Sequence, residues 1–411
     1  MDRDQGSRWH GSVTKVELSA TFLFFAIAVG YPVWRGLLDP QPEVDFRFYW
    51  FAGYMWAHGL DPYSSAFHQM GTQLVPTGNG LEYWLYPPNW WIVSRCLAAF
   101  DLATAIIVWR LTSTAILIAS TGAVVAALAQ EQPLPRRLMI VSGACALATT
   151  IEATGNALIN GQVSPILVYL GLTLIVLSQL RRSPLLMAIG LVLVSLKPQI
   201  GLTVYLAVAF AVEWRKPLLI ALVSDLVLAS PQFLSFGAVT TAREWAYNLS
   251  KWGRLGGNEI LTGPGHFVAR LGGSFPVGAQ FALATLTAVA AGMLYRRDPR
   301  SLAATTILIA GVAAFAPLHT YDMPLLVLLT CMIWKLEENR ICQAVLAAAL
   351  ILILRPTRLE AMLGITFYDY GAGVLTLSLA AFLLLAVAIH VAWSHRCSNR
   401  RRTEPPSPAL C

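Results

Sequence analysis

Three ionisable residues stand at the ends of apolar stretches, where a charge is poorly placed for packing in lipid but well placed to meet a polar substrate. Asp45 follows the first apolar stretch and lies among aromatic residues in Val44-Asp45-Phe46-Arg47-Phe48-Tyr49-Trp50. Lys197 is the one cation of an otherwise apolar hairpin, and His319 follows another apolar run. A carboxylate at a membrane surface can take a proton from a substrate hydroxyl. We therefore interpret Asp45 as a catalytic base.

The composition places these residues in a membrane protein. The chain has 411 residues, of which 56% are hydrophobic and 12% are charged, and its mean hydropathy is +0.60. Soluble globular proteins are less apolar and carry about twice that charged fraction. The six cysteines are scattered and form neither a disulfide framework nor a zinc spacing. The sequence predicts an all-α polytopic membrane protein.

Basic residues mark one side of the membrane. They recur in pairs or small groups between the apolar runs, from Arg136-Arg137 to the tail with Arg400-Arg401-Arg402. Such groups are typical of cytoplasmic turns. If the N-terminus also lies inside, about twelve spans satisfy this pattern, although several are short for a crossing of ~20 residues. The expected spans are 16–38, 102–129, 137–156, 163–180, 183–197, 199–214, 217–231, 276–295, 301–317, 322–336, 341–354 and 372–393.

The same pattern divides the chain into one transmembrane domain, 1–393, and a tail, 394–411, that we expect to be disordered and cytoplasmic. Two long loops, 39–100 and 232–275, fall on the outer side. The first carries Gly59-Leu60-Asp61-Pro62-Tyr63 and Tyr86-Pro87-Pro88, so we expect short interfacial helices there, joined by Gly and Pro turns. One of them should cover Pro88–Phe100, which is too short to span and carries Arg95.

A series of motifs with a common sidedness resembles glycosyltransferase family 87, membrane transferases of the GT-C type that use polyprenyl-phosphate sugars. The series is Asp45, the Gly59 to Tyr63 turn, Tyr86-Pro87-Pro88, Gly161-Gln162, Leu196-Lys197-Pro198 and His319 with Asp322. The resemblance covers roughly 16–335 and is strongest over 45–88 and 160–200. It implies GT-C architecture and an active site on the extracytoplasmic side of the cell membrane.

The resemblance also implies roles for residues. An inverting transferase needs a base for the acceptor hydroxyl and donors to hold the leaving phosphate. Asp45 maps onto the base, and the candidates for the donor phosphate are Lys197, His319, Arg47, Arg355 and Arg358. The expected substrate-binding residues are Tyr49, Asp61, Tyr63, Tyr86, Asn160, Gln162 and Asp322.

The implied partners are a polyprenyl-phosphate donor of mannose or another hexose, a glycolipid or glycan acceptor, and membrane lipids. No nucleic-acid partner and no cofactor are expected. A metal is not required for a monophosphate leaving group, and the sequence has no dense acidic cluster such as Asp-x-Asp to hold one.

Structural interpretations of these residues remain open. Asp45 could cap an interfacial helix, Lys197 could be a membrane anchor whose ammonium reaches the interface, and His319 could be a satisfied interfacial side chain. Two other functions are also open. Glu152 and Asp225 within spans are compatible with a transporter or flippase of lipid-linked sugars, although no half repeat is visible. A non-catalytic scaffold for envelope assembly would tolerate replacement of Asp45.

Overall fold

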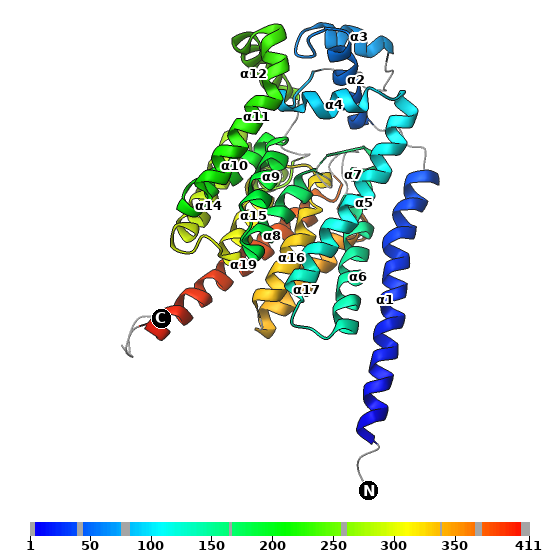
Figure 1. Ribbon diagram of the computed structural model, residues 1–411, viewed down its shortest axis with the longest axis vertical. Helices are drawn as coiled ribbons and strands as arrows, with labels where there is room; N and C mark the ends of the chain where they lie inside the picture. Colours follow the sequence, from blue (N-terminus) through cyan, green and yellow to red (C-terminus); the bar gives the residue numbers. More distant parts are fainter. Residues whose placement is uncertain are drawn as a thin grey trace.

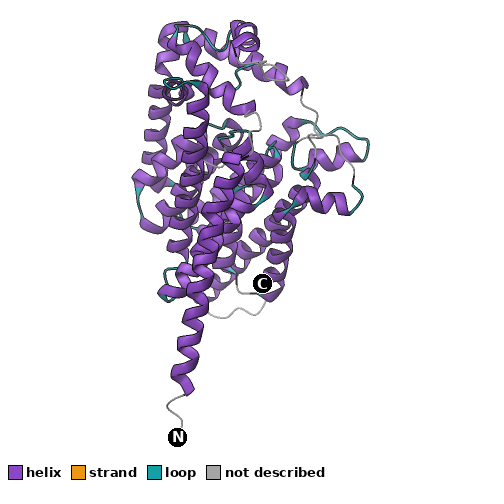
Figure 2. Cartoon of the chain, turned by 90° about the vertical axis from the view of Figure 1, so that its right-hand side faces the viewer, coloured by secondary structure: helices purple, strands orange, loops and turns teal. Residues whose placement is uncertain are grey.

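The computed structural model describes residues 5–38, 44–74, 83–163, 167–255, 261–337, 339–365 and 372–403. Within these ranges all regular secondary structure is helical and no strand occurs, as Figure 2 shows. The all-α fold expected from the composition is therefore confirmed for this part of the chain.

Among the described residues, five helical segments are long and apolar enough to cross a membrane, and the number rises to seven if two bent pairs are each counted as one span. The long ones are α1 (Gln5–Leu38), α5 (Leu102–Leu128), α11 (Arg215–Phe236), α14 (Val277–Arg297) and α19 (Val374–Thr403). The bent pairs are α6 (Leu134–Thr150) with α7 (Glu152–Ile159), at 57°, and α17 (Arg340–Leu354) with α18 (Pro356–Met362), at 90°. This makes the chain a multi-pass membrane protein.

Five more apolar helices in the described part of the chain are shorter than a full crossing. They are α8 (Tyr169–Arg181), α9 (Pro184–Ser195), α10 (Pro198–Ala209), α15 (Leu302–Phe315) and α16 (Leu325–Leu336). Every span expected from the sequence overlaps one of these long, bent or short helices. The helix positions therefore follow the prediction, while the count of twelve crossings stays a prediction because the short helices do not reach ~20 residues.

Turns with basic residues meet at one end of the bundle. Lys335, in the last turn of α16, forms an ion pair of 2.7 Å with Glu131, between α5 and α6. Arg300, between α14 and α15, pairs at 2.7 Å with Glu213 of the short helix η3 (Val212–Trp214). In Figure 1 α1 starts and α19 ends toward the lower end. We refer to this as the basic end.

The opposite end carries the helices of the two long loops. Figure 1 shows α2 (Val44–Ala57), α3 (Ala66–Leu74), α4 (Trp91–Leu97) and α12 (Ala238–Leu255) together at the top, with α4 lying across the bundle. Two further short helices are η1 (Pro88–Trp90) and α13 (Pro264–Arg270). The first loop thus contains the short helices that the sequence predicts. Residues 39–43, 75–82 and 256–260 of the expected loops lie outside the described residues.

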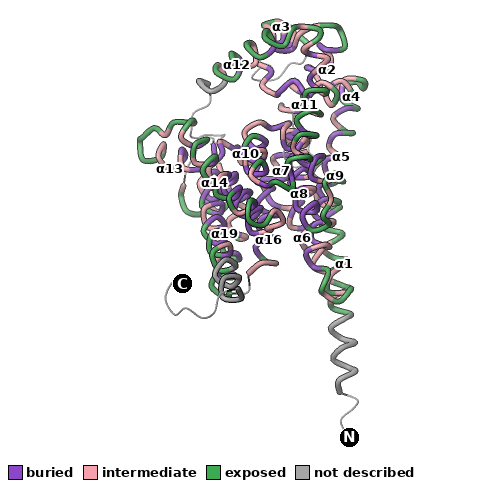
Figure 3. Tube along the Cα trace, turned by 60° about the vertical axis from the view of Figure 1, so that its left-hand side comes forward, coloured by how far each residue is buried: buried purple, intermediate pink, exposed green. Residues whose placement is uncertain are grey.

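The core lies where α8, α15 and α16 are surrounded by other helices, whereas α1, α3 and α12 are largely exposed (Figure 3). Close packing depends on small residues, since a Cβ on Gly171 of α8 would lie 2.8 Å from the carbonyl oxygen of Gly190 of α9. Small residues at such contacts are characteristic of helix packing in membranes. At the C-terminus, α19 continues to Thr403, and residues 404–411 of the expected tail lie outside the described residues.

Candidate active site

Asp45 lies in the first turn of α2, where the positive end of the helix dipole favours a carboxylate. Its Oδ2 accepts a hydrogen bond from Nε2 of Gln162, a residue that follows α7 and is 117 positions away in sequence. Tyr49, one helical turn after Asp45, lies on the same face of α2. The first turn of α2 therefore faces the α7–α8 connection.

The hydrogen bonds of Gln162 define which way its amide points. Its Oε1 accepts from the Tyr49 hydroxyl at 3.3 Å, so its Nε2 is directed at Asp45. The Tyr49 and Tyr86 hydroxyl groups lie 2.7 Å apart, and the Tyr49 ring stacks on Trp90 at 4.8 Å. Because Tyr49 is completely buried and Gln162 nearly so, this chain of contacts holds the Asp45 side chain in one orientation.

Gly161 explains how the α7–α8 connection comes so close to α2. It has φ +67°, and a Cβ built on it would lie 2.4 Å from Cβ of Phe46. The Phe46 amide also donates to the Asn160 carbonyl at 3.1 Å. Glycine alone combines this left-handed conformation with so close an approach. The Gly161-Gln162 motif therefore brings an amide against the carboxylate.

Lys197 caps the start of α10, immediately before Pro198, and only 4% of its surface is exposed. Its Nζ forms a buried ion pair with Oδ1 of Asp322 and lies 5.4 Å from the centre of the Tyr321 ring. The cation expected at the membrane surface is thus a member of an ion pair within the protein. Such a pair must be well hydrogen-bonded to offset the cost of removing both charges from water.

The helix η5 (Thr320–Asp322) supplies the acidic partner. Oδ2 of Asp322 accepts from the His319 amide at 3.1 Å, which closes a capping box with His319 at the N-cap. The His319 and Tyr321 rings stack with centres 4.8 Å apart. His319, Tyr321 and Asp322 therefore form one compact turn against Lys197.

Burial and charge link Asp45 to this turn. Removal from water raises the pKa of the Asp45 carboxyl to about 6, and the nearby Asp322 charge acts in the same direction. The hydrogen bond from Gln162 and the positive charge of Lys197 oppose the rise in this pKa. Asp45, Lys197 and Asp322 thus share one electrostatic environment, in which Asp45 is ionised at neutral pH and becomes protonated in mild acid.

The turn Leu196-Lys197-Pro198, called the Lys197 corner below, is fixed by residues to which the sequence analysis gave no role. Asn89 Nδ2 donates at 2.9 Å to both Ser195 Oγ and Asp225 Oδ1, and Tyr205 donates at 2.8 Å to Asp225 Oδ2. The indole N–H of Trp90 donates to the Leu196 carbonyl at 2.8 Å. The Tyr86-Pro87-Pro88 element therefore aims η1 at the Lys197 corner. The two prolines beside an Asn-Trp pair are the signal that could have identified this contact.

Other predicted site residues have different surroundings. Asp61 accepts from the Tyr63 amide and from Gln232 Nε2, both at 3.0 Å, and the Tyr63 hydroxyl donates to the Tyr86 carbonyl at 2.7 Å. These contacts brace the first loop and give Asp61 and Tyr63 a structural role. Among the described residues, the side chain of Asp45 bonds to Gln162 and not to either of these two.

Two of the remaining predicted cations, Arg355 and Arg358, lie three residues apart at the start of α18, and the third, Arg47, lies on α2. Arg355 donates to the Thr150 carbonyl at 2.7 Å, Arg358 is exposed on α18, and Arg47 is partly buried on α2. Glu152, unassigned from the sequence, accepts from the Thr357 hydroxyl. Residues with metal-binding side chains gather elsewhere, at the basic end, where ligand atoms of Glu337, Cys342 and His390 lie within 4.8 Å of one another.

Comparison with known protein families gives a match over the middle of the chain. The model of glycosyltransferase family 87 matches residues 84–320, which is more than half of the chain. The matched range contains Gln162, Lys197 and His319, whereas Asp45 precedes it and Asp322 follows it. No curated protein matches the chain.

Proposed function

Because the chain belongs to glycosyltransferase family 87, we propose that it transfers mannose or another hexose from a polyprenyl-phosphate donor to a glycolipid or glycan acceptor. Family membership implies a sugar donor and an acceptor, and the multi-pass helical fold is suited to lipid-linked substrates. The observation that carries the finer proposal is that a partly buried carboxylate, Asp45, and a buried lysine, Lys197, share one electrostatic environment.

In this proposal Asp45 is the general base. The acceptor hydroxyl oxygen attacks the anomeric carbon, the bond from that carbon to the phosphate oxygen breaks, and the hydroxyl proton passes to Asp45. Attack opposite the leaving group inverts the anomeric centre. A pKa of about 6 leaves Asp45 ionised at neutral pH and makes it a stronger base than an ordinary aspartate. Gln162, held by Tyr49, positions the carboxylate.

Lys197 and His319 stabilise the leaving phosphate. A lysine ammonium has three N–H donors, so Lys197 can bind a phosphate oxygen while it remains bonded to Asp322. Asp322 then acts as the residue that aims the ammonium. Secondary candidates for substrate contact are Arg47, Arg355, Arg358 and Asn160. The side chains of the protein thus supply both the base and the hydrogen-bond donors to the phosphate that this chemistry needs.

The proposal places the reaction on the extracytoplasmic side. With about twelve crossings, all the basic turns fall inside, and the turns that carry Gln162, Lys197 and His319 fall outside together with α2. The ion pairs at the basic end support this sidedness, since they join turns that it assigns to one face.

The test is transfer by the purified protein from radiolabelled polyprenyl-phosphate-mannose to crude membrane lipids. Asp45→Asn should lower the rate by about 10²–10⁴-fold, the usual contribution of a general base. Asp101→Asn is the matched control, because Asp101 is the exposed N-cap of α5 and asparagine caps equally well.

Full transfer by Asp45→Asn would contradict the assigned base. If label never leaves the donor for any acceptor fraction or alternative donor sugar, the proposed reaction is wrong. In that case a transport assay with the same lipid-linked sugar in vesicles examines the flippase alternative.

A further inference from the structure

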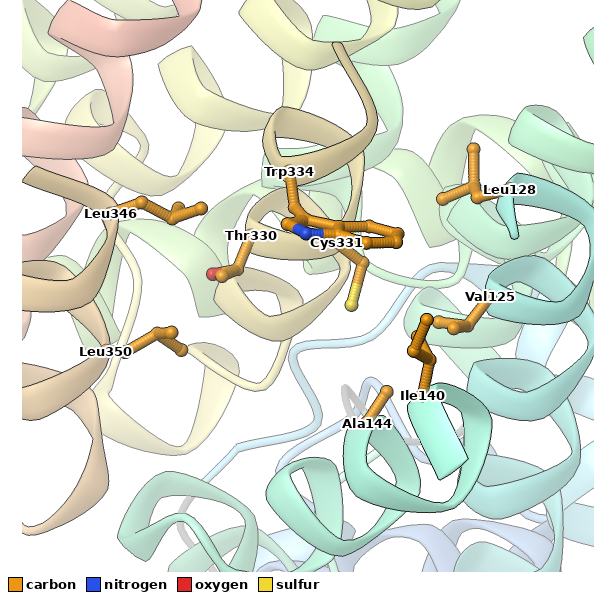
Figure 4. A pocket seen from close by; sticks show the side chains of 9 residues that line it. All are labelled: Val125, Leu128, Ile140, Ala144, Thr330, Cys331, Trp334, Leu346 and Leu350. Atoms are coloured by element: carbon orange, nitrogen blue, oxygen red, sulfur yellow. The ribbon is translucent and has the colours of Figure 1, made fainter. Parts of the chain in front are cut away.

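A cavity of about 150 Å³ lies among α5, α6, α16 and α17, and none of its lining residues belongs to the candidate active site. Val125 and Leu128 come from the last turn of α5, and Ile140 and Ala144 from the middle of α6. The opposite wall consists of Leu346 and Leu350 of α17. Figure 4 shows these two walls with α16 between them.

The lining is suited to a hydrocarbon chain. Thr330 donates its hydroxyl to the Leu326 carbonyl within α16, so this polar group is satisfied without an occupant. Figure 4 shows the Cys331 sulfur directed between the walls and the Trp334 indole extending across the cavity. Trp334 is 40% exposed, and Leu138, two residues before Ile140 on α6, is 41% exposed. The cavity therefore opens on a surface that meets lipid tails in a membrane-spanning bundle.

Positive charge lies at one end of this cavity. Arg136 and Arg137 precede Ile140 by one helical turn, so they project from the same face of α6 as Ile140 and Ala144. Arg136 is exposed and Arg137 is partly exposed, and neither forms an ion pair with a described residue. Lys335 follows Trp334 and is paired with Glu131. The two arginines are therefore the charges available to a headgroup.

We propose that this cavity binds part of one acyl chain of an anionic phospholipid whose headgroup phosphate binds Arg136 and Arg137. An apolar cavity with basic residues one helical turn beyond it matches a lipid that has an acyl tail and a negative headgroup. Because the cavity lies toward the basic end of α5, α6 and α16, this lipid is bound independently of the substrates that meet at Asp45. The proposal does not depend on the transferase reaction.

The test uses the full-length protein in lipid nanodiscs that contain phosphatidylglycerol or phosphatidylcholine with brominated acyl chains. Bromine quenches indole fluorescence at contact, and subtracting the signal of Trp334→Phe isolates Trp334. Brominated phosphatidylglycerol should quench Trp334 at lower mole fraction than brominated phosphatidylcholine. Replacing each arginine with glutamine should weaken this preference about fivefold.

Lys216→Gln is the control, since Lys216 is exposed and begins a different helix, α11. It should leave the preference unchanged. Equal quenching by the two lipids in the wild type would overturn the proposal, because it is the result expected of bulk lipid. Quenching by a brominated prenyl phosphate but not by phosphatidylglycerol, or a second copy of the chain cross-linked at Trp334, would also overturn it.

Discussion

The two ends of the bundle use charge in opposite ways. At the basic end, Lys335 and Glu131 are 32% and 73% exposed, and Arg300 and Glu213 are 38% and 36% exposed. In the Lys197–Asp322 pair the side chains alone are only 5% and 0% exposed. Exposed pairs contribute little to folding because water screens them, whereas a buried pair has a large desolvation cost.

This difference teaches which charges are retained for something other than stability. An apolar pair of similar volume in place of Lys197 and Asp322 would be expected to fold at least as well. The charge of Asp45 also does not stabilise the fold, because burial disfavours its ionised form and raises its pKa. Buried charges that disfavour folding and lie together are candidates for catalysis, and the exposed ones at the basic end are suited to setting membrane orientation.

The largest expected effect is a loss of stability when the buried Lys197–Asp322 pair is broken, compared with the exposed Lys335–Glu131 pair. Lys197→Met leaves the Asp322 carboxylate buried without its ammonium and should destabilise the protein by about 3–5 kcal/mol. Lys335→Met removes the same type of side chain from the exposed pair and should leave the melting temperature unchanged. Thermal unfolding in detergent measures both, and equal losses would mean that the two ends do not differ.

A second comparison uses two glycines of similar conformation. Gly161 and Gly59 have φ +67° and +71°, but only Gly161 has a neighbour, Cβ of Phe46 at 2.4 Å from an added Cβ. Gly161→Ala should therefore cost about 1–3 kcal/mol more than Gly59→Ala, the usual cost of overpacking. It should also slow transfer, because Gln162 moves away from Asp45. Equal stability of the two variants would contradict the close approach.

A smaller effect is expected at Asp225. Asp225→Asn exchanges an acceptor of three hydrogen bonds for an amide and should cost about 1 kcal/mol. The double exchange Asn89→Asp with Asp225→Asn restores an amide–carboxylate bond between these positions. It should recover part of the stability and of the affinity for the donor, since the Lys197 corner is again held. Additive losses in the double variant would show that the two residues act separately.

The sequence predicted the helices and the end of the bundle at which each turn lies. Both follow from apolar runs and basic groups, which are visible in the local sequence. Asp45, Gln162, Lys197 and His319 were expected at one end, and the structure brings the turns that carry them together there. This part of the site follows from the alternation of turns along a membrane chain.

The partners could not be predicted in the same way. Lys197 and Asp322 are 125 positions apart, so their pairing depends on how α10 packs against η5. Asp225 was noticed as a charge within a span, but its three donors come from η1, α9 and α10. The number of crossings could not be predicted either. Several apolar helices are too short for a full crossing, and hydropathy alone does not show which of them span the membrane.

The most direct measurement of the central claim is the pH dependence of kcat/KM for sugar transfer. Transfer should rise with pH and level off above a midpoint near pH 6, because only ionised Asp45 accepts the proton and its pKa is about 6. Gln162→Leu removes a hydrogen bond that lowers this pKa, so its midpoint should move to higher pH, and Asp45→Asn should lose the rise altogether. A profile that is flat from pH 5 to 8, or the same rise in Asp45→Asn, would contradict the assignment of Asp45 as the base.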